Sequence, residues 1–219
     1  KLRRQEKQIN PGMFMAGYAD TTLHYVLTGR YRLASESMKK IRAAIGSVLE
    51  ADRVFINLAR CEYYLQLGQK RRANTVLYSL NDSATFKSDF FQLEKTLIET
   101  RLCEAYSVQN VRTLEHGLSI TKNLGTLYQQ CKVLLELAAV LISLDEKTKA
   151  HEYSKQARRV ARTNGYRPLG ARALLLMGLT AEKPRERQFC LLGALQAADE
   201  IGLPELAAES AFHLGSFHV

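Results

Sequence analysis

The sequence has few residues that interrupt helices and no long apolar run. Trp is absent, and Pro occurs only at positions 11, 168, 184 and 204. No run approaches the roughly 18 consecutive apolar residues that a membrane span requires. The basic start, Lys1 to Lys7, has no apolar segment behind it long enough for a signal peptide. These absences predict a cytoplasmic or nuclear protein that does not enter a membrane.

The cysteines and histidines form no ligand or redox pattern. Cys61, Cys103, Cys131 and Cys190 are far apart in sequence, and none belongs to a CxxC motif that would indicate zinc or a redox dithiol. Their apolar settings predict small buried side chains in a reducing compartment. The five histidines lack metal-ligand spacing. We therefore expect no metal and no cofactor.

Motifs of catalysis are missing as well. The sequence has neither the GxxxxGK[ST] loop that cradles phosphates nor the GxSxG turn of a nucleophile. The adjacent carboxylates Asp145-Glu146 and Asp199-Glu200 fall at expected helix ends or turns, where solvated surface charge is the simpler interpretation. The sequence predicts a protein that is not an enzyme.

The composition is that of a folded domain with an excess of positive charge. Of 219 residues, 46% are hydrophobic and 24% charged, which argues against disorder. The formal net charge is +9 and the sequence pI is about 9.4. Such a balance favours solubility and is compatible with an anionic partner, but says nothing about fold.

A pattern of an aromatic residue or Leu, a turn residue four positions later and an alanine five after that occurs three times. It reads Tyr25…Gly29…Ala34, Tyr64…Gly68…Ala73 and Leu141…Asp145…Ala150. Aligned on the small residue of the first helix, six units centre on Thr22, Cys61, Leu102, Ala138, Gly178 and Gly215. Their spacings are 39, 41, 36, 40 and 37 residues, and the third unit is weak because Leu114 stands where Ala is expected.

This pattern resembles the tetratricopeptide repeat, a helix pair with Leu-Gly and an aromatic residue in its first helix and Ala in its second. The resemblance covers about residues 13–219, with units longer than the family's usual 34 residues. It implies an all-α fold of about eleven helices, a right-handed superhelical solenoid of antiparallel pairs.

Helical periodicity and capping residues give the same fold without the family. Apolar residues between 134 and 142 recur on one broad helical face, and no segment sustains the alternation of a strand. Gly165 predicts a left-handed helix end, and Pro168 the first turn of the next helix. The sequence Gly202-Leu-Pro204 predicts a second helix end at glycine followed by a helix start at proline.

Two regions are expected: a basic N-terminal extension over residues 1–12 and the repeat array over 13–219. The first residue is not Met, and Val219 falls inside a first helix without a partner. We therefore expect a fragment of a longer array or chain.

The resemblance places a binding groove on the concave surface lined by the first helices. Its expected residues are Leu23, Val26, Leu58, Glu62, Leu65, Leu135, Ala139, Ile142, Leu175 and Leu179. The Lys and Asn carboxylate clamp of chaperone-binding relatives is absent, since Ala19, Leu23, Leu58 and Glu62 stand at those positions. An apolar groove favours an extended or helical protein segment. Alternatively, some of these side chains pack between neighbouring helices.

Basic residues gather at the turn inside each expected pair. They are Arg30, Arg32, Lys70, Arg71, Arg72, Arg112, Lys147, Lys149, Lys183, Arg185 and Arg187. Cations at the start of a helix oppose its dipole, so local stability does not explain them. They form either ordinary solvated turns or an edge for an acidic protein or nucleic acid.

The function expected from these features is a protein-interaction scaffold, a subunit of a larger assembly that binds a peptide or another subunit along its groove. The alternative is a sensor or a domain that binds nucleic acid or an acidic ligand through the basic edge.

Overall fold

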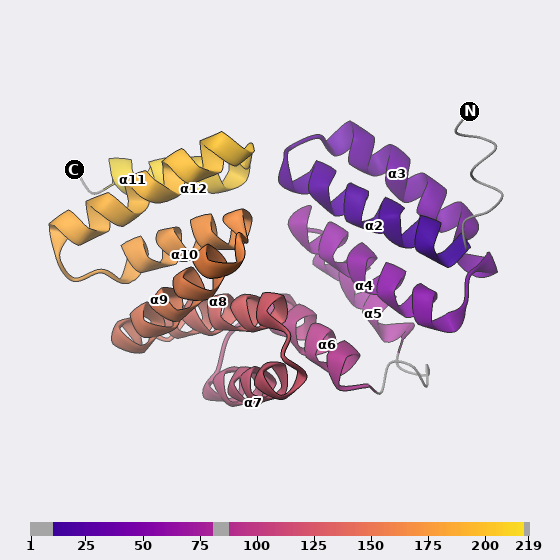
Figure 1. Cartoon of the computed structure of the whole chain (residues 1–219), viewed down its shortest axis with the longest axis horizontal. Helices are drawn as coiled ribbons and strands as arrows, with labels where there is room; N and C mark the ends of the chain where they lie inside the picture. The colour runs from indigo at the N-terminus through magenta and orange to yellow at the C-terminus, as the bar shows by residue number, and fades with distance from the viewer. Residues whose placement is uncertain (1–10, 81–87, 217–219) are drawn as a thin grey trace. The chain divides into compact units, whose positions relative to one another are not determined.

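The computed structural model describes residues 11–80 and 88–216, and within these ranges every regular element is a helix (Figure 1). Eleven α-helices and one 3₁₀ turn follow one another in the described chain, which confirms the all-α prediction. The helices are α2 (Pro11–Leu27), α3 (Tyr31–Ala44), α4 (Glu50–Gln66), α5 (Lys70–Tyr78), α6 (Asp89–Leu102), α7 (Val108–Leu124), α8 (Leu127–Ser143), α9 (Lys147–Asn164), α10 (Arg167–Thr180), α11 (Pro184–Ile201) and α12 (Pro204–Gly215). The turn η1 spans Ile45–Ser47. Residues 1–10 of the predicted basic extension lie outside the described ranges, and Pro11 and Gly12 begin α2.

The chain divides into two compact units, Lys1–Leu102 and Cys103–Val219. The division falls in the third repeat, the unit with the weakest pattern. The expected alanine position of that repeat is Leu114, which is fully buried in the second unit.

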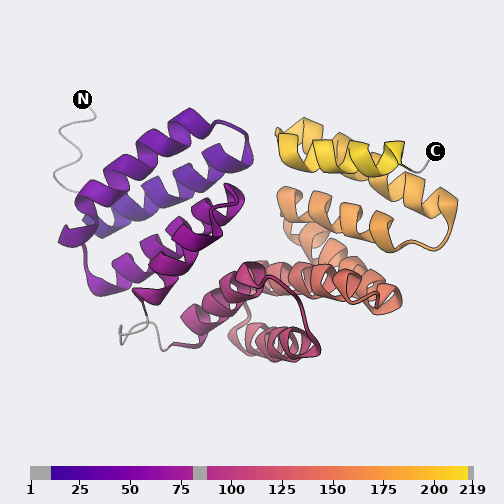
Figure 2. The same cartoon turned by 180° about the vertical axis from the view of Figure 1, so that it is seen from behind.

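The first helices of the predicted pairs are α2, α4, α6, α8, α10 and α12; in each unit, first helices pack on their second helices and also stack on each other. In unit 1, α2 packs on α3 and α4, and α4 packs on α5 and α6. In unit 2, α8 packs on α7, α9 and α10, and α10 packs on α9, α11 and α12. Figure 2 shows the same pairing from behind. A helix that contacts its own partner and the next first helix buries apolar side chains that no single pair could bury.

Three turns inside pairs share one backbone geometry, at the residues where the spacing pattern predicted a turn. Gly29, Gly68 and Asp145 have φ of 70°, 68° and 60°. The N–H of the residue after each turn residue donates to the carbonyl five positions earlier, at 2.7 Å to Tyr25, 2.8 Å to Tyr64 and 2.9 Å to Leu141. The turn residue itself donates three positions back, at 3.0 Å in all three cases. This double closure is the Schellman motif, which satisfies the last carbonyls of a helix.

Small residues lie where helices touch, as the pattern predicted. Ala34, Ala73, Ala138 and Ala150 have 0% of their surface exposed, and Gly178 is buried. A Cβ on Gly178 would lie 2.7 Å from the Leu191 side chain and 3.3 Å from its backbone nitrogen. The close approach of α10 and α11 therefore depends on this glycine.

The six predicted repeat centres fall on six alternating helices, although their register drifts. Thr22, Cys61 and Ala138 lie five residues before the ends of α2, α4 and α8, whereas Leu102 and Gly215 are the last residues of α6 and α12. In α12 the buried small residue at the shared register is Ser210, with 0% exposure. The spacing pattern therefore placed each repeat on the correct helix. In α6 and α12, however, it aligned on a residue five positions after the shared register.

Two second helices end at glycine, and the next helices begin with proline in their first turn, as predicted. Gly165 and Gly202 close α9 and α11 with φ of 71° and 69°. Pro168 and Pro204 then stand in the first turns of α10 and α12, where a missing N–H leaves no bond unmade. None of the described helices is long and apolar enough to cross a membrane.

Candidate functional site

The described residues contain no group of three or more His, Cys, Asp or Glu side chains that could hold a metal ion. The four cysteines are free, and three of them are buried. Cys103 is only half-buried and accepts a hydrogen bond from Asn110 Nδ2 at 3.4 Å, so its setting differs from the apolar one expected.

The buried cysteine thiols are held in the protonated form. Burial raises the pKa of Cys61 to about 12 and that of Cys131 to about 11. Each Sγ donates to a carbonyl of the partner helix at 3.4 Å, Cys61 to Ala73 and Cys131 to Ala157. A thiol that resists ionisation is a poor nucleophile and a poor metal ligand, so these two side chains act in packing.

The predicted groove residues divide into two sets by exposure. Val26, Leu58, Leu135 and Leu175 are at most 5% exposed and belong to the cores of their units. Leu23, Glu62, Leu65, Ala139, Ile142 and Leu179 are half-buried. Leu23 and Leu65 border the core of unit 1, and Leu179 borders that of unit 2. Only the half-buried set offers side-chain surface to a ligand, and the groove itself stays a prediction.

Ion pairs join successive first helices, α4 to α6 and α8 to α10. In unit 1, Arg101 on α6 contacts the Glu62 carboxylate on α4, and both side chains are largely buried. In unit 2, Arg172 on α10 lies 3.4 Å from Glu136 on α8. Because Arg101 neutralises Glu62, the predicted acidic residue of the groove serves the stacking of α4 on α6.

The predicted basic residues all lie at or beside the first turns of the second helices. Arg30 and Arg32 lie at the start of α3, Lys70, Arg71 and Arg72 at that of α5, Arg112 in α7, Lys147 and Lys149 at that of α9, and Lys183, Arg185 and Arg187 at that of α11. All are exposed except Arg187. Its guanidinium Nη2 folds back and donates to the Ala181 carbonyl at 3.1 Å, which removes it from the exposed set.

Local acidic residues compensate part of this charge. Arg32 lies 3.3 Å from Glu36, Lys147 lies 3.1 Å from Asp145, and Lys149 lies 3.1 Å from Glu146. The first turns of α3, α5, α7 and α9 nevertheless contain no acidic residue. Their basic side chains add to the positive end of each helix dipole, so each of these helix ends attracts anions.

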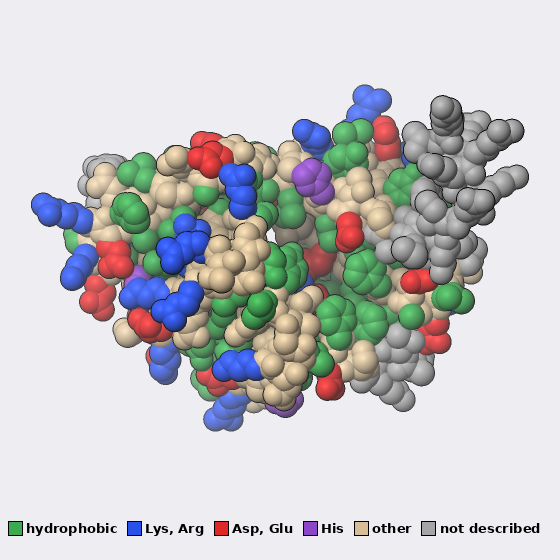
Figure 3. All heavy atoms as spheres, in the orientation of Figure 1, with side chains coloured by type: hydrophobic (Ala, Val, Ile, Leu, Met, Phe, Trp, Pro, Cys, Tyr) green, Lys and Arg blue, Asp and Glu red, His purple; other side chains and the backbone are tan. Residues whose placement is uncertain are grey.

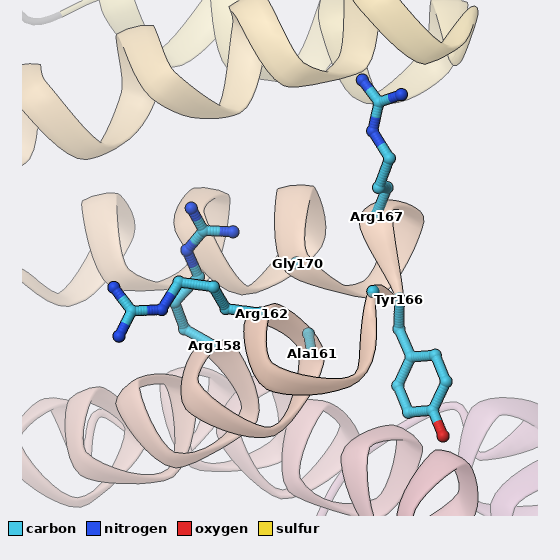
Figure 4. A pocket seen from close by; sticks show the side chains of 7 residues that line it. Arg158, Ala161, Arg162, Tyr166, Arg167 and Gly170 are labelled. Carbon is cyan, nitrogen blue, oxygen red and sulfur yellow. The ribbon is translucent and has the colours of Figure 1, made fainter.

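The second unit also has a basic notch that was not predicted from the sequence. The turn between α9 and α10 borders a cavity of about 180 Å³, lined by Arg158, Ala161, Arg162, Gly165, Tyr166, Arg167 and Gly170 (Figure 4). On the face shown in Figure 3, Lys and Arg side chains gather over the part of the molecule formed by α9 to α11. The sequence signal was Gly170, a glycine within a helix, together with the run of arginines at 158, 159 and 162.

No protein-family model matches the chain, and a search of curated proteins found no similar sequence.

Proposed function

We propose that this protein is a non-catalytic scaffold of tetratricopeptide-like helix pairs that binds a segment of another protein along its first helices. The proposal includes a place in a larger multiprotein assembly. The observation that carries it is the half-buried apolar set on the first helices, which neighbouring helices cover only in part.

The chemistry of this surface fits a peptide ligand better than a reaction. Leu23 and Leu65 in unit 1 and Ile142 and Leu179 in unit 2 supply apolar contact. The polar groups beside them are engaged in ion pairs between helices. An amphipathic helix or an extended segment binds to such a surface by burying its own apolar side chains.

The experiment is an affinity capture with the intact chain, followed by crosslinking and mass spectrometry. Leu65→Arg and Ile142→Arg place a charge on the proposed surface of each unit and should abolish capture of the same proteins. The controls are Tyr78→Arg and Phe189→Arg, which change exposed aromatic residues on second helices, 70% and 74% exposed. Circular dichroism and the melting temperature report whether each variant folds. Equal capture by all five proteins would refute the groove.

A second candidate function, the binding of an acidic ligand or nucleic acid, is favoured by the basic first turns without acidic residues. Such binding weakens steeply as salt increases, because each neutralised phosphate releases a counterion. A groove that buries apolar surface responds little to salt. The salt dependence of binding therefore separates the two functions.

A further inference from the structure

We propose that the notch between α9 and α10 is a binding site for a phosphate monoester, presented as a phosphoserine or phosphothreonine by a protein partner. This inference rests on the proposed scaffold function, because it assumes that the partner is a protein. The site differs in place from the apolar surface on the first helices. It uses the end of a second helix and the turn that follows.

Two arginines that line the notch have no carboxylate to neutralise them. Arg158 and Arg162 lie one turn apart on α9, and neither forms an ion pair with any acidic side chain in the described ranges. Arg167, the third arginine, lies 3.1 Å from Glu200 on α11 and is already paired. Figure 4 shows the Arg158 and Arg162 side chains leaving α9 next to the notch, with their guanidinium groups pointing in different directions and Arg167 directed away from both.

Stability accounts for one of these arginines but not for the pair. Arg162 is in the last turn of α9, where a cation favours the helix dipole. Arg158 lies a turn earlier, and two like charges at positions i and i+4 repel each other. An anion bound between the two guanidinium groups would offset this repulsion.

The position of the Arg158 guanidinium depends on Gly170. The guanidinium Nη1 lies 2.9 Å from the point that a Cβ on Gly170 would occupy, and Ala161 Cβ lies 3.6 Å from the same point. Arg158 is half-buried there, whereas Arg159, the next residue, is exposed and does not line the notch. A partly buried side chain has fewer conformations to lose on binding an anion than a fully exposed one.

The charge of the site selects a monoester. A phosphorylated serine or threonine carries about −1.5 to −2 charges at pH 7 and three acceptor oxygens, which two arginines can neutralise and bind in a bidentate manner. A phosphodiester or a carboxylate carries a single charge and would leave one guanidinium uncompensated. The residues that line the notch all lie between positions 158 and 170, and such a small site fits one phosphate group better than a nucleic-acid backbone.

The test is an NMR titration of the intact chain, in which the Nε–H signals of arginine side chains report binding. The probe is a pool of five-residue peptides centred on phosphoserine, and the same pool without the phosphate is the reference. Phosphopeptides should shift the signals of Arg158 and Arg162. Arg158→Gln or Arg162→Gln should weaken binding by roughly tenfold or more, the usual effect of losing a hydrogen bond to a charged group.

Two further variants separate the site from general electrostatics. Arg159→Gln removes the same charge from the same helix and should leave binding unchanged. Gly170→Ala keeps every charge, displaces the Arg158 guanidinium and should weaken binding, while the melting temperature stays the same or rises because Ala is the better helix former. Equal losses in Arg158→Gln and Arg159→Gln, or normal binding by Gly170→Ala, would overturn the site.

The remaining arms distinguish the sources of phosphate. Inorganic phosphate that binds as tightly as the phosphopeptides would overturn the assignment to a protein. An oligonucleotide without terminal phosphates that binds through Arg158 and Arg162 with equal affinity would overturn the preference for a monoester. A failure of the proposed scaffold function gives a different result. Leu65→Arg and Ile142→Arg would then leave protein capture intact, whatever the notch binds.

Discussion

Small side chains set the distance between the two helices of a pair. Ala73 on α5 is completely buried, and its carbonyl accepts the hydrogen bond of the Cys61 thiol on α4. We expect Ala73→Leu to lower the free energy of unfolding by about 1–3 kcal/mol, because the added carbons have no space between α4 and α5. The neighbouring Asn74→Leu, at an exposed position, should change it by less than about 0.5 kcal/mol. Urea unfolding of both variants measures the difference, and an Ala73→Leu protein as stable as the parent would show that the repeat register is misassigned.

Buried thiols make the stability depend on alkaline pH. An exposed cysteine in the unfolded chain ionises near pH 8.5, whereas the folded pKa is about 12 for Cys61 and about 11 for Cys131. Above pH 8.5 the unfolded state therefore releases protons that the folded state keeps, so the free energy of unfolding falls as pH rises. Replacing both cysteines by Ala should flatten this decline between pH 9 and 11, as measured by urea unfolding. The same slope in parent and variant would show that the thiols ionise freely in the folded protein.

At the scale of elements, the left-handed turn residue is the feature that ends a first helix. Gly68 adopts φ of 68° at no steric cost, whereas Asp145 adopts 60° with a side chain. We expect Gly68→Ala to destabilise unit 1 by about 1 kcal/mol, and Asp145→Gly to leave unit 2 unchanged or slightly more stable. Gly46→Ala is the control, because Gly46 has open space around it and an ordinary φ. If Gly46→Ala and Gly68→Ala give the same melting curve, the turn geometry contributes nothing to stability.

The sequence was most informative about elements where local backbone chemistry decided the outcome. Gly29, Gly68 and Asp145 could be placed because a left-handed residue at a fixed distance from an aromatic residue or Leu follows from helix termination alone. The third repeat and the register of α12 were less accessible, since Leu102 and Gly215 satisfied the spacing without lying at the shared register. The notch was missed because Arg158 and Gly170 come together only when α10 folds back on α9. Which groove residues are buried also depends on contacts between helices, those of α2 with α4 and of α8 with α10 among them.

At the scale of the whole molecule, the exposed first-turn cations suggest a test of the second candidate function. Reversal of Arg71, Arg72, Lys147 and Lys149 to Glu lowers the net charge by eight, from +9 to +1. Glu in the first turn favours the helix dipole, so α5 and α9 should remain folded. Lys147 and Lys149 lose their pairs with Asp145 and Glu146, but pairs this exposed contribute little.

If these turns bind an anionic partner, the reversed protein should lose affinity for a single-stranded oligonucleotide and for poly-L-glutamate. The slope of log affinity against log salt should flatten by about 0.7 for each phosphate of a single strand that the protein no longer neutralises. Fluorescence anisotropy over a range of salt concentrations measures both quantities. The control is the reversal of Lys122 and Lys155 to Glu, two exposed cations outside the first turns, which changes the net charge by four, half as much. An equal loss per charge in that control would mean that the anions respond to the net charge of the protein and not to the first turns.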